Sequence, residues 1–151
     1  ALPYGLELRT IAAAQAGQAF TPLLRFDNSN TGNTGGNFGS DRPDILRAAT
    51  YPRTADAWFG ADAFAVPARF TFGNAGRNIL LGPGLFSWDF ALYKQFSVTE
   101  SKFFQFRFEA FNFTNTPNFG FPNSQVGNAN FGFIAGADRP RNLQLGLKFV
   151  F

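Results

Sequence analysis

The chain has 151 residues and a formal net charge of +3, with 22 Phe, 16 Gly and 9 Pro but no Cys or Met and no His. The missing cysteines exclude a disulfide framework and thiolate metal sites, and the missing histidines remove the commonest general base. Only 15% of the residues are charged, and the chain contains no run of basic residues that would predict a nucleic-acid partner. No apolar run approaches the roughly 18 residues of a membrane-spanning helix. The many aromatic and turn-forming residues instead predict an all-β chain.

The first predicted strand covers residues 4–15. Leu6 and Leu8 alternate there with Glu7 and Arg9, the period of two that marks a strand with two unlike faces. The alanines at 12–14 leave a helix open as an alternative for the second half of this segment. Residues 21–85 follow as a long connection rich in Asn, Gly, Pro and Asp, and segments of this kind are usually functional loops or disordered.

Part of this connection carries oxygen atoms of the kind that bind Ca²⁺. Asp27, Asn28, Asn30 and Asn33 are the residues concerned. An EF-hand-like loop requires a Glu at its twelfth position, where this chain has Phe38. We therefore expect a polar loop here and assign no metal site.

Residues 86–98 show the clearest alternation in the chain, and residues 103–114 repeat it after a tight turn at 99–101. Lys94 interrupts the first apolar face, but its long stem can reach a polar boundary. The apolar sets contain Phe86, Trp88, Phe90 and Leu92, then Phe104, Phe106 and Phe108; the polar sets contain Asp89, then Gln105, Arg107 and Glu109.

A second long connection, 115–141, has room for a short strand near 131–135 and leads to the last predicted strand, 142–151. Leu143, Leu145 and Leu147 share its apolar face. Outer-membrane barrels typically end in a strand with a polar residue, a glycine two positions later and a final pair of apolar or aromatic residues spaced by two. Four residues fit this pattern and predict a signal that the barrel-assembly machinery engages by edge pairing: Gln144, Gly146, Phe149 and Phe151.

The lengths of the connections agree with an outer-membrane topology. Such barrels have short periplasmic turns, long extracellular loops and antiparallel strands of about ten residues. With the end of 142–151 in the periplasm, both long connections lie outside and the turn at 99–101 lies inside. The apolar sets then face lipid or a partner, and the polar sets face the lumen.

Four segments of the chain resemble the final strands of TonB-dependent receptors, most closely the large Oar-like class that carries a carboxypeptidase-regulatory-like domain. They are LPYGLELRTIAAAQAGQAFTP, FGNAGRNILLGPGLFSWDFALYKQF, FQFRFEAFNFTNTPNFG and PRNLQLGLKFVF. The resemblance implies a plugged barrel that imports or binds bulky ligands with energy from the TonB system. It also implies that the plug and most of the barrel lie outside these residues.

The strand count limits what the chain can be alone, because the smallest membrane barrels need about eight strands. In the main hypothesis, the remaining strands and plug of a receptor and the lipid complete the sheet. The alternatives are a processed fragment that assembles edge to edge into an extracellular β-rich filament or oligomer, and a soluble β-sandwich that binds a ligand. Asp89 and Glu109 are explained as lumen residues, so no catalytic or cofactor site is assigned and no enzyme is expected.

Overall fold

The chain folds as two compact units in the computed structural model, which describes residues 5–32 and 41–151. The first unit contains Ala1–Gln15, Leu85–Asn118 and Asp138–Phe151. The second contains Ala16–Gly84 and Phe119–Ala137. The second unit thus consists mostly of residues from the two long connections, together with residues 16–20.

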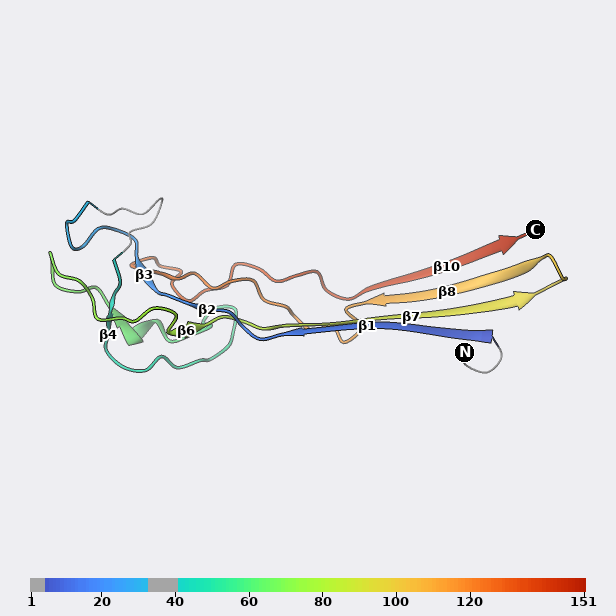
Figure 1. Ribbon diagram of the computed structural model, residues 1–151, viewed down its shortest axis with the longest axis horizontal. Helices are drawn as coiled ribbons and strands as arrows, with labels where there is room; N and C mark the ends of the chain where they lie inside the picture. Colours follow the sequence, from blue (N-terminus) through green and yellow to red (C-terminus); the bar gives the residue numbers. More distant parts are fainter. Residues whose placement is uncertain (1–4, 33–40) are drawn as a thin grey trace. The chain divides into compact units, whose positions relative to one another are not determined.

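The first unit is a four-stranded antiparallel sheet. Its strands are β1 (Leu6–Gln15), β7 (Leu85–Ser97), β8 (Phe103–Phe111) and β10 (Asn142–Val150), in the spatial order β1-β7-β8-β10 (Figure 1). The all-β prediction is confirmed, and the four long strands lie where alternation placed them. The helical alternative for residues 12–14 is wrong, because Ala12 pairs with Trp88 and Ala14 with Phe86 in the ladder between β1 and β7.

The ends of β7 and β8 differ in the way they reverse the chain. Where β7 leads directly into β8, the Val98 N–H and the Thr99 N–H both donate to the Lys102 carbonyl, at 2.8 and 3.1 Å, which closes a tight turn. At the other end, β8 stops at Phe111, before the predicted 114, because Asn112 adopts a left-handed backbone with φ of 48°. Asn tolerates this conformation, and its amide both accepts from and donates to the backbone of Thr116.

The second unit contains six two-residue strands and one short 3₁₀ helix among its described residues. β2 (Ala19–Phe20) pairs with β6 (Leu80–Leu81), β4 (Asp44–Ile45) with β5 (Phe64–Ala65), and β3 (Leu23–Leu24) with β9 (Gln125–Val126), the last pair parallel. The helix is η2 (Ala61–Ala63). The short strand expected near 131–135 is wrong: the strand of that connection is β9, and the Ile134 N–H donates to the Ala55 carbonyl instead.

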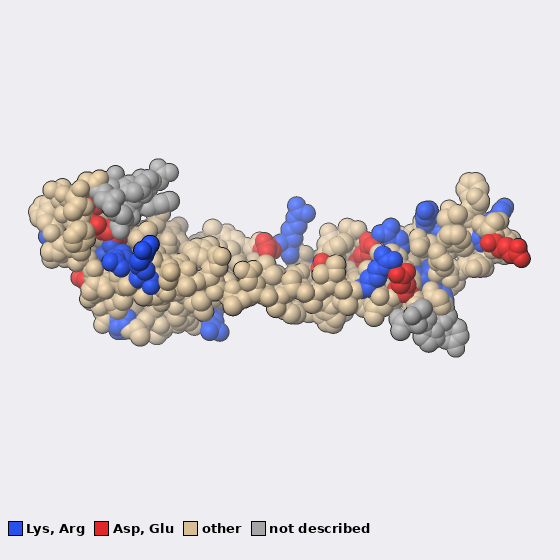
Figure 2. Space-filling model, in the orientation of Figure 1, with Lys and Arg blue, Asp and Glu red and all other residues tan. Residues whose placement is uncertain are grey.

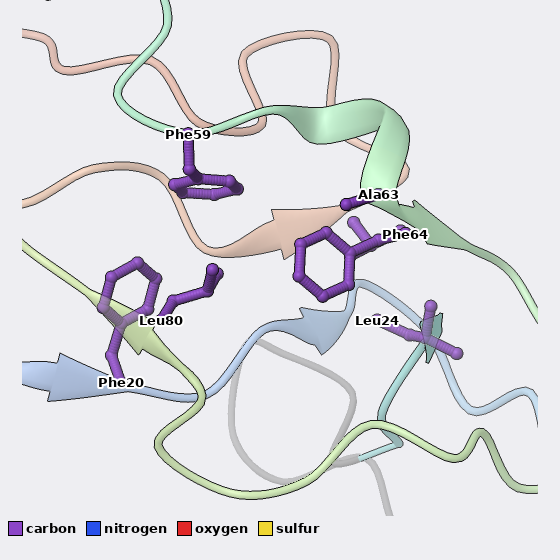
Figure 3. Packing of buried hydrophobic residues seen from close by; sticks show 7 residues of the cluster. Phe20, Leu24, Phe59, Ala63, Phe64 and Leu80 are labelled. Carbon is purple, nitrogen blue, oxygen red and sulfur yellow. The ribbon is translucent and has the colours of Figure 1, made fainter. Parts of the chain in front are cut away.

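A small hydrophobic core holds the second unit together (Figure 3). Phe59 is 1% exposed and lies at its centre, with ring centroids 5.9 Å from Phe20, 6.3 Å from Phe64 and 5.0 Å from Phe131. These distances are those of favourable tilted and edge-to-face aromatic pairs. The buried residues of the cluster are Phe20, Leu24, Phe59, Ala63, Phe64, Leu80 and Val126.

Polar side chains fix the backbone around this core. The buried Asn28 donates to the carbonyls of Ala68 and Thr71, at 2.9 and 3.0 Å. The Asp27 carboxylate accepts from the N–H groups of Thr31 and Gly32. Both side chains therefore have intramolecular partners, which favours the polar loop expected from the sequence. Asn33 and Phe38, which were also considered for Ca²⁺, lie outside the described residues.

The apolar side chains of the sheet are largely open to solvent. Leu145 is 73% exposed and Leu147 is 72% exposed, and within the described residues no second sheet covers their face. The burial that a soluble β-sandwich requires is thus not found in this part of the chain. None of the described residues forms a helix with the length and hydropathy of a membrane span.

Candidate functional site

The register of the sheet aligns the apolar residues of all four strands on one face. Leu92 lies opposite Leu8 on one side and Phe108 on the other, and Phe108 lies opposite Leu145. Directly opposed residues share a face, and alternate residues of a strand return to it. The same face therefore carries all the apolar residues predicted to share one: Phe86, Trp88, Phe90, Leu92, Phe104, Phe106, Phe108, Leu143, Leu145 and Leu147.

Aromatic rings gather at both ends of this apolar face. Near the short turn, Phe104 lies 4.6 Å from Phe149, ring centroid to ring centroid. Near the long connections, Phe113 lies 5.5 Å from Trp88 and 5.4 Å from Phe90. The rows between these two groups carry leucines on β1, β7 and β10, together with Lys94, and phenylalanines on β8. An apolar band with aromatic groups at both ends is the distribution that membrane barrels show on their outer surface.

Two residues break the apolar face, and each contacts an aromatic neighbour. The Lys94 ammonium lies 5.4 Å from the ring centroid of Phe96, within cation–π range. Thr10 accepts a hydrogen bond from the indole N–H of Trp88 and donates to the Asp89 carbonyl. Both polar groups on this face therefore have partners inside the sheet.

The opposite face carries a cluster of charged groups around Tyr93. The Tyr93 hydroxyl donates to Glu109 at 2.8 Å, and Arg107 donates to the same carboxylate oxygen at 2.7 Å. The guanidinium carbons of Arg9 and Arg107 lie 5.0 and 5.4 Å from the centroid of the Tyr93 ring. Acidic and basic side chains lie next to one another over the sheet in Figure 2. We call Arg9, Tyr93, Arg107 and Glu109 the tyrosine cluster.

The other polar residues of this face lie on either side of the tyrosine cluster. Gln105 lies opposite Gln95 and Lys148, toward the short turn. Asp89 accepts from the Asn112 N–H at 2.9 Å, at the end where the long connections leave the sheet. An open hollow of about 210 Å³ on this face is lined by residues that include Arg9, Asp89, Tyr93 and Glu109. Ile11, 72% exposed, is an apolar exception on this face.

The predicted assembly signal lies on an outer strand of the sheet. β10 pairs only with β8 among the described residues, so its other edge is open. Gln144 and Gly146 lie on the polar face, opposite Glu109 and Arg107. Phe149 lies 5.8 Å from Phe151, centroid to centroid, and Phe151 is 87% exposed. The four residues therefore lie along one accessible edge, the arrangement that recognition by edge pairing requires.

A family model described as outer membrane beta barrel domain matches residues 1–144, nearly the whole chain. The chain belongs to the outer membrane beta barrel domain family. No curated protein and no solved structure matches it. Membership explains why the barrel domain presents a sheet with one apolar and one charged face, because the strands of such barrels separate lipid from a polar interior.

Sequence reasoning found the faces of the barrel domain but missed several contacts. Its polar sets did not single out Tyr93, the residue that contacts both arginines and Glu109. Phe113 was counted as part of β8, whereas it lies beyond the strand and packs against Trp88. Both contacts depend on how neighbouring strands and the segments beyond them pack together, and a single strand's alternation does not contain that information.

Proposed function

We propose that the chain is a non-enzymatic structural segment, the C-terminal part of the barrel of a TonB-dependent receptor in the bacterial outer membrane. The observation that carries the proposal is the alignment of apolar side chains over four neighbouring strands, with the tyrosine cluster on the reverse face. The first face contacts lipid. The second faces the lumen, where a plug supplies further partners.

The height of the apolar face supports a membrane location. Phe86 and Phe96 are ten residues apart in β7, which corresponds to about 33 Å of strand at roughly 3.3 Å per residue. A strand tilt of about 45° reduces this to about 23 Å along the membrane normal, close to the roughly 25 Å apolar band of outer-membrane barrels. Both aromatic groups then lie at the level of the lipid headgroups.

The open edges of the sheet support a larger barrel. β1 and β10 each pair on one side only within the described residues, so both have unused backbone groups. In a bilayer such groups require partners, because no water is present to satisfy them. The preceding strand of the receptor pairs with β1, and the first strand of the barrel pairs with β10.

The TonB-dependent class rests on the resemblance of four segments together with the family. The reading frame that contains this chain provides a test. It should encode a plug and about eighteen further strands, since plugged transporters of this kind have about 22. A reading frame that encodes only these residues and a secretion signal would contradict the proposal that the chain is part of a receptor.

Recognition by the barrel-assembly machinery is tested at Phe151. Phe151→Ala in the full gene product should lower the fraction of protein inserted in the outer membrane, because it removes the last aromatic residue of the assembly signal. Phe72→Ala is the matched control, since Phe72 is also exposed, at 70%, but lies in the second unit. Protease protection in membrane fractions measures the inserted fraction, and equal insertion of both variants contradicts this role.

Self-assembly is a second candidate, favoured by the strand order. The four strands alternate in direction, so β10 of one copy meets β1 of the next in an antiparallel arrangement. Two copies would provide eight strands, about the number of the smallest barrels, and more copies would form a ribbon or filament. Cryo-microscopy of the isolated chain separates these outcomes. Filaments with a repeat near 4.8 Å support self-assembly, and uniform small particles without detergent oppose it.

A further inference from the structure

The second unit contains a hollow that neither the apolar face nor the tyrosine cluster includes. Its volume is about 460 Å³, within the range of small-molecule sites. It is lined by Gly17, Tyr51, Arg53, Trp58, Leu81, Gly82 and Gly84. The lining therefore combines two aromatic rings, one cation and three glycines, and contains no acidic side chain.

The two rings are held in place by one residue. The Trp58 indole N–H donates to the Leu81 carbonyl at 2.8 Å, and the Leu81 N–H donates to the Tyr51 hydroxyl oxygen at 3.0 Å. The segments that carry Trp58 and Leu81 are anchored in the core, because their neighbours Phe59 and Leu80 are each 1% exposed. The aromatic wall of the hollow is therefore preorganised, which lowers the entropy cost of binding.

The floor of the hollow is bare backbone. A Cβ on Gly17 would lie 1.9 Å from the Gly82 carbonyl oxygen, so no other residue fits at this position without moving the chain. Gly82 in turn donates its N–H to the Gln18 carbonyl at 2.8 Å. These two segments therefore pack backbone to backbone, and the three glycines contribute no side chain to the lining.

Arg53 supplies the single charge of the lining. Its backbone is left-handed, with φ of 59°, a conformation that costs energy for a residue other than glycine or asparagine. Its N–H donates to the Trp58 carbonyl at 3.3 Å and thereby closes the turn that carries both residues. Its guanidinium has no hydrogen-bond or ion-pair partner within residues 5–32 and 41–151.

From this geometry we propose that the hollow binds a small carboxylate attached to a six-membered ring. The ring stacks on Trp58 and Tyr51, and the carboxylate accepts a paired hydrogen bond from Arg53. A sugar acid and an aromatic acid share this chemistry. The site belongs to the second unit and does not depend on the identity of the surrounding receptor.

The test uses the full chain in detergent micelles with glucuronate and benzoate as probes, and glucose and benzyl alcohol as their neutral counterparts. Calorimetry measures affinity. Fluorescence of Trp58, in a Trp88→Phe background that removes the other tryptophan, reports where the probe binds. One or both acids should bind at least about tenfold more tightly than its neutral counterpart, the difference expected of one charge-assisted hydrogen bond.

Two variants distinguish a binding role of Arg53 from a structural one. Arg53→Asn accepts the left-handed backbone, so it should keep or raise the unfolding temperature while weakening acid binding at least about tenfold. Arg77→Gln, which removes an exposed cation of the same unit outside the hollow, should bind like the unaltered chain. Binding of glucuronate alone identifies a sugar-acid site, and binding of benzoate alone an aromatic-acid site. Failure of both acids to bind, or unchanged binding in Arg53→Asn, overturns the proposal.

Discussion

Tyr93 on β7 donates its hydroxyl proton to Glu109 on β8 at 2.8 Å, while both arginines of the tyrosine cluster lie near its ring. This single side chain joins charges from the two strands that flank β7, because Arg9 belongs to β1 and Arg107 to β8. Charged residues on the polar face therefore contact one another across the sheet. They connect the strands through a shared aromatic residue.

Replacement of Tyr93 separates the two kinds of contact. Tyr93→Phe removes the hydrogen bond to Glu109 but keeps the ring for both guanidinium groups, so it should lower the unfolding temperature in detergent slightly. Tyr93→Leu removes both contacts and should lower it further. Circular dichroism during heating measures the two midpoints. A Phe variant as stable as the unaltered chain contradicts a contribution from the hydrogen bond.

Because Phe59 lies at the centre of its core, we expect a substitution at Phe59 to destabilise the second unit strongly. Phe59→Ala removes a ring that contacts three other aromatic residues at 1% exposure and should destabilise this unit by about 3–5 kcal/mol. Phe72→Ala is the control, because Phe72 is 70% exposed and its loss should change stability by no more than about 0.5 kcal/mol. Denaturant titration followed by fluorescence of Trp58, in the Trp88→Phe background, measures both. Equal midpoints for the two variants would show that the long connections lack this core.

The backbone around Gly73 leaves no room for a side chain at this position. A Cβ there would lie 2.2 Å from the Arg42 carbonyl oxygen and 2.3 Å from that of Pro43, all of them backbone atoms. Gly73→Ala should therefore cost about 1–3 kcal/mol of stability through overpacking. Gly136→Ala, where an added Cβ meets no atom within 4 Å, should cost much less. Similar losses at the two positions, measured by denaturant titration, would count against this close packing.

The environment of Asp27 predicts a dependence on pH. Burial alone would raise the pKa of this carboxyl, but hydrogen bonds from the N–H groups of Gly32 and Thr31 and from the Ser29 hydroxyl outweigh it and lower the pKa. A carboxyl with a depressed folded pKa stabilises the fold above its ordinary pKa, near 4, and loses this contribution as the pH falls through the folded value.

Asp27→Asn tests this dependence. The variant should be less stable than the unaltered chain at neutral pH, and the difference should shrink as the solution is acidified below pH of about 4. Asp41 accepts from the same Ser29, so Asp41→Asn provides the comparison for a neighbouring carboxylate. Unfolding temperatures at several pH values measure the effect. A difference that is constant over this pH range contradicts the role assigned to the Asp27 charge.

The sequence predicted the four long strands because alternation is a local property that each strand carries by itself. It predicted the apolar and polar sets for the same reason. The predicted strand extended to residue 114, whereas the left-handed backbone of Asn112 ends β8 at Phe111. A turn of this kind is set by one residue's backbone and leaves no periodic signal.

Sequence patterns did not predict the second unit. Its core joins residues from both long connections, as in the parallel pairing of Leu24 with Val126 and the contact of Phe59 with Phe131. Strands of two residues are too short to show a period. Composition alone therefore described these segments as loops, and only their three-dimensional contacts reveal the hollow at Arg53.

The central claim is that one face of the sheet contacts lipid while the other contacts water. Because the chain has no cysteine, single spin labels at Leu143→Cys to Lys148→Cys report each position of β10 in outer-membrane vesicles, in the full gene product without other cysteines. Collision rates with oxygen, which concentrates in lipid, and with a water-soluble nickel complex measure the environment. We expect high oxygen access at 143, 145 and 147 and high nickel access at 144, 146 and 148. Equal access to the nickel complex at all six positions would contradict it.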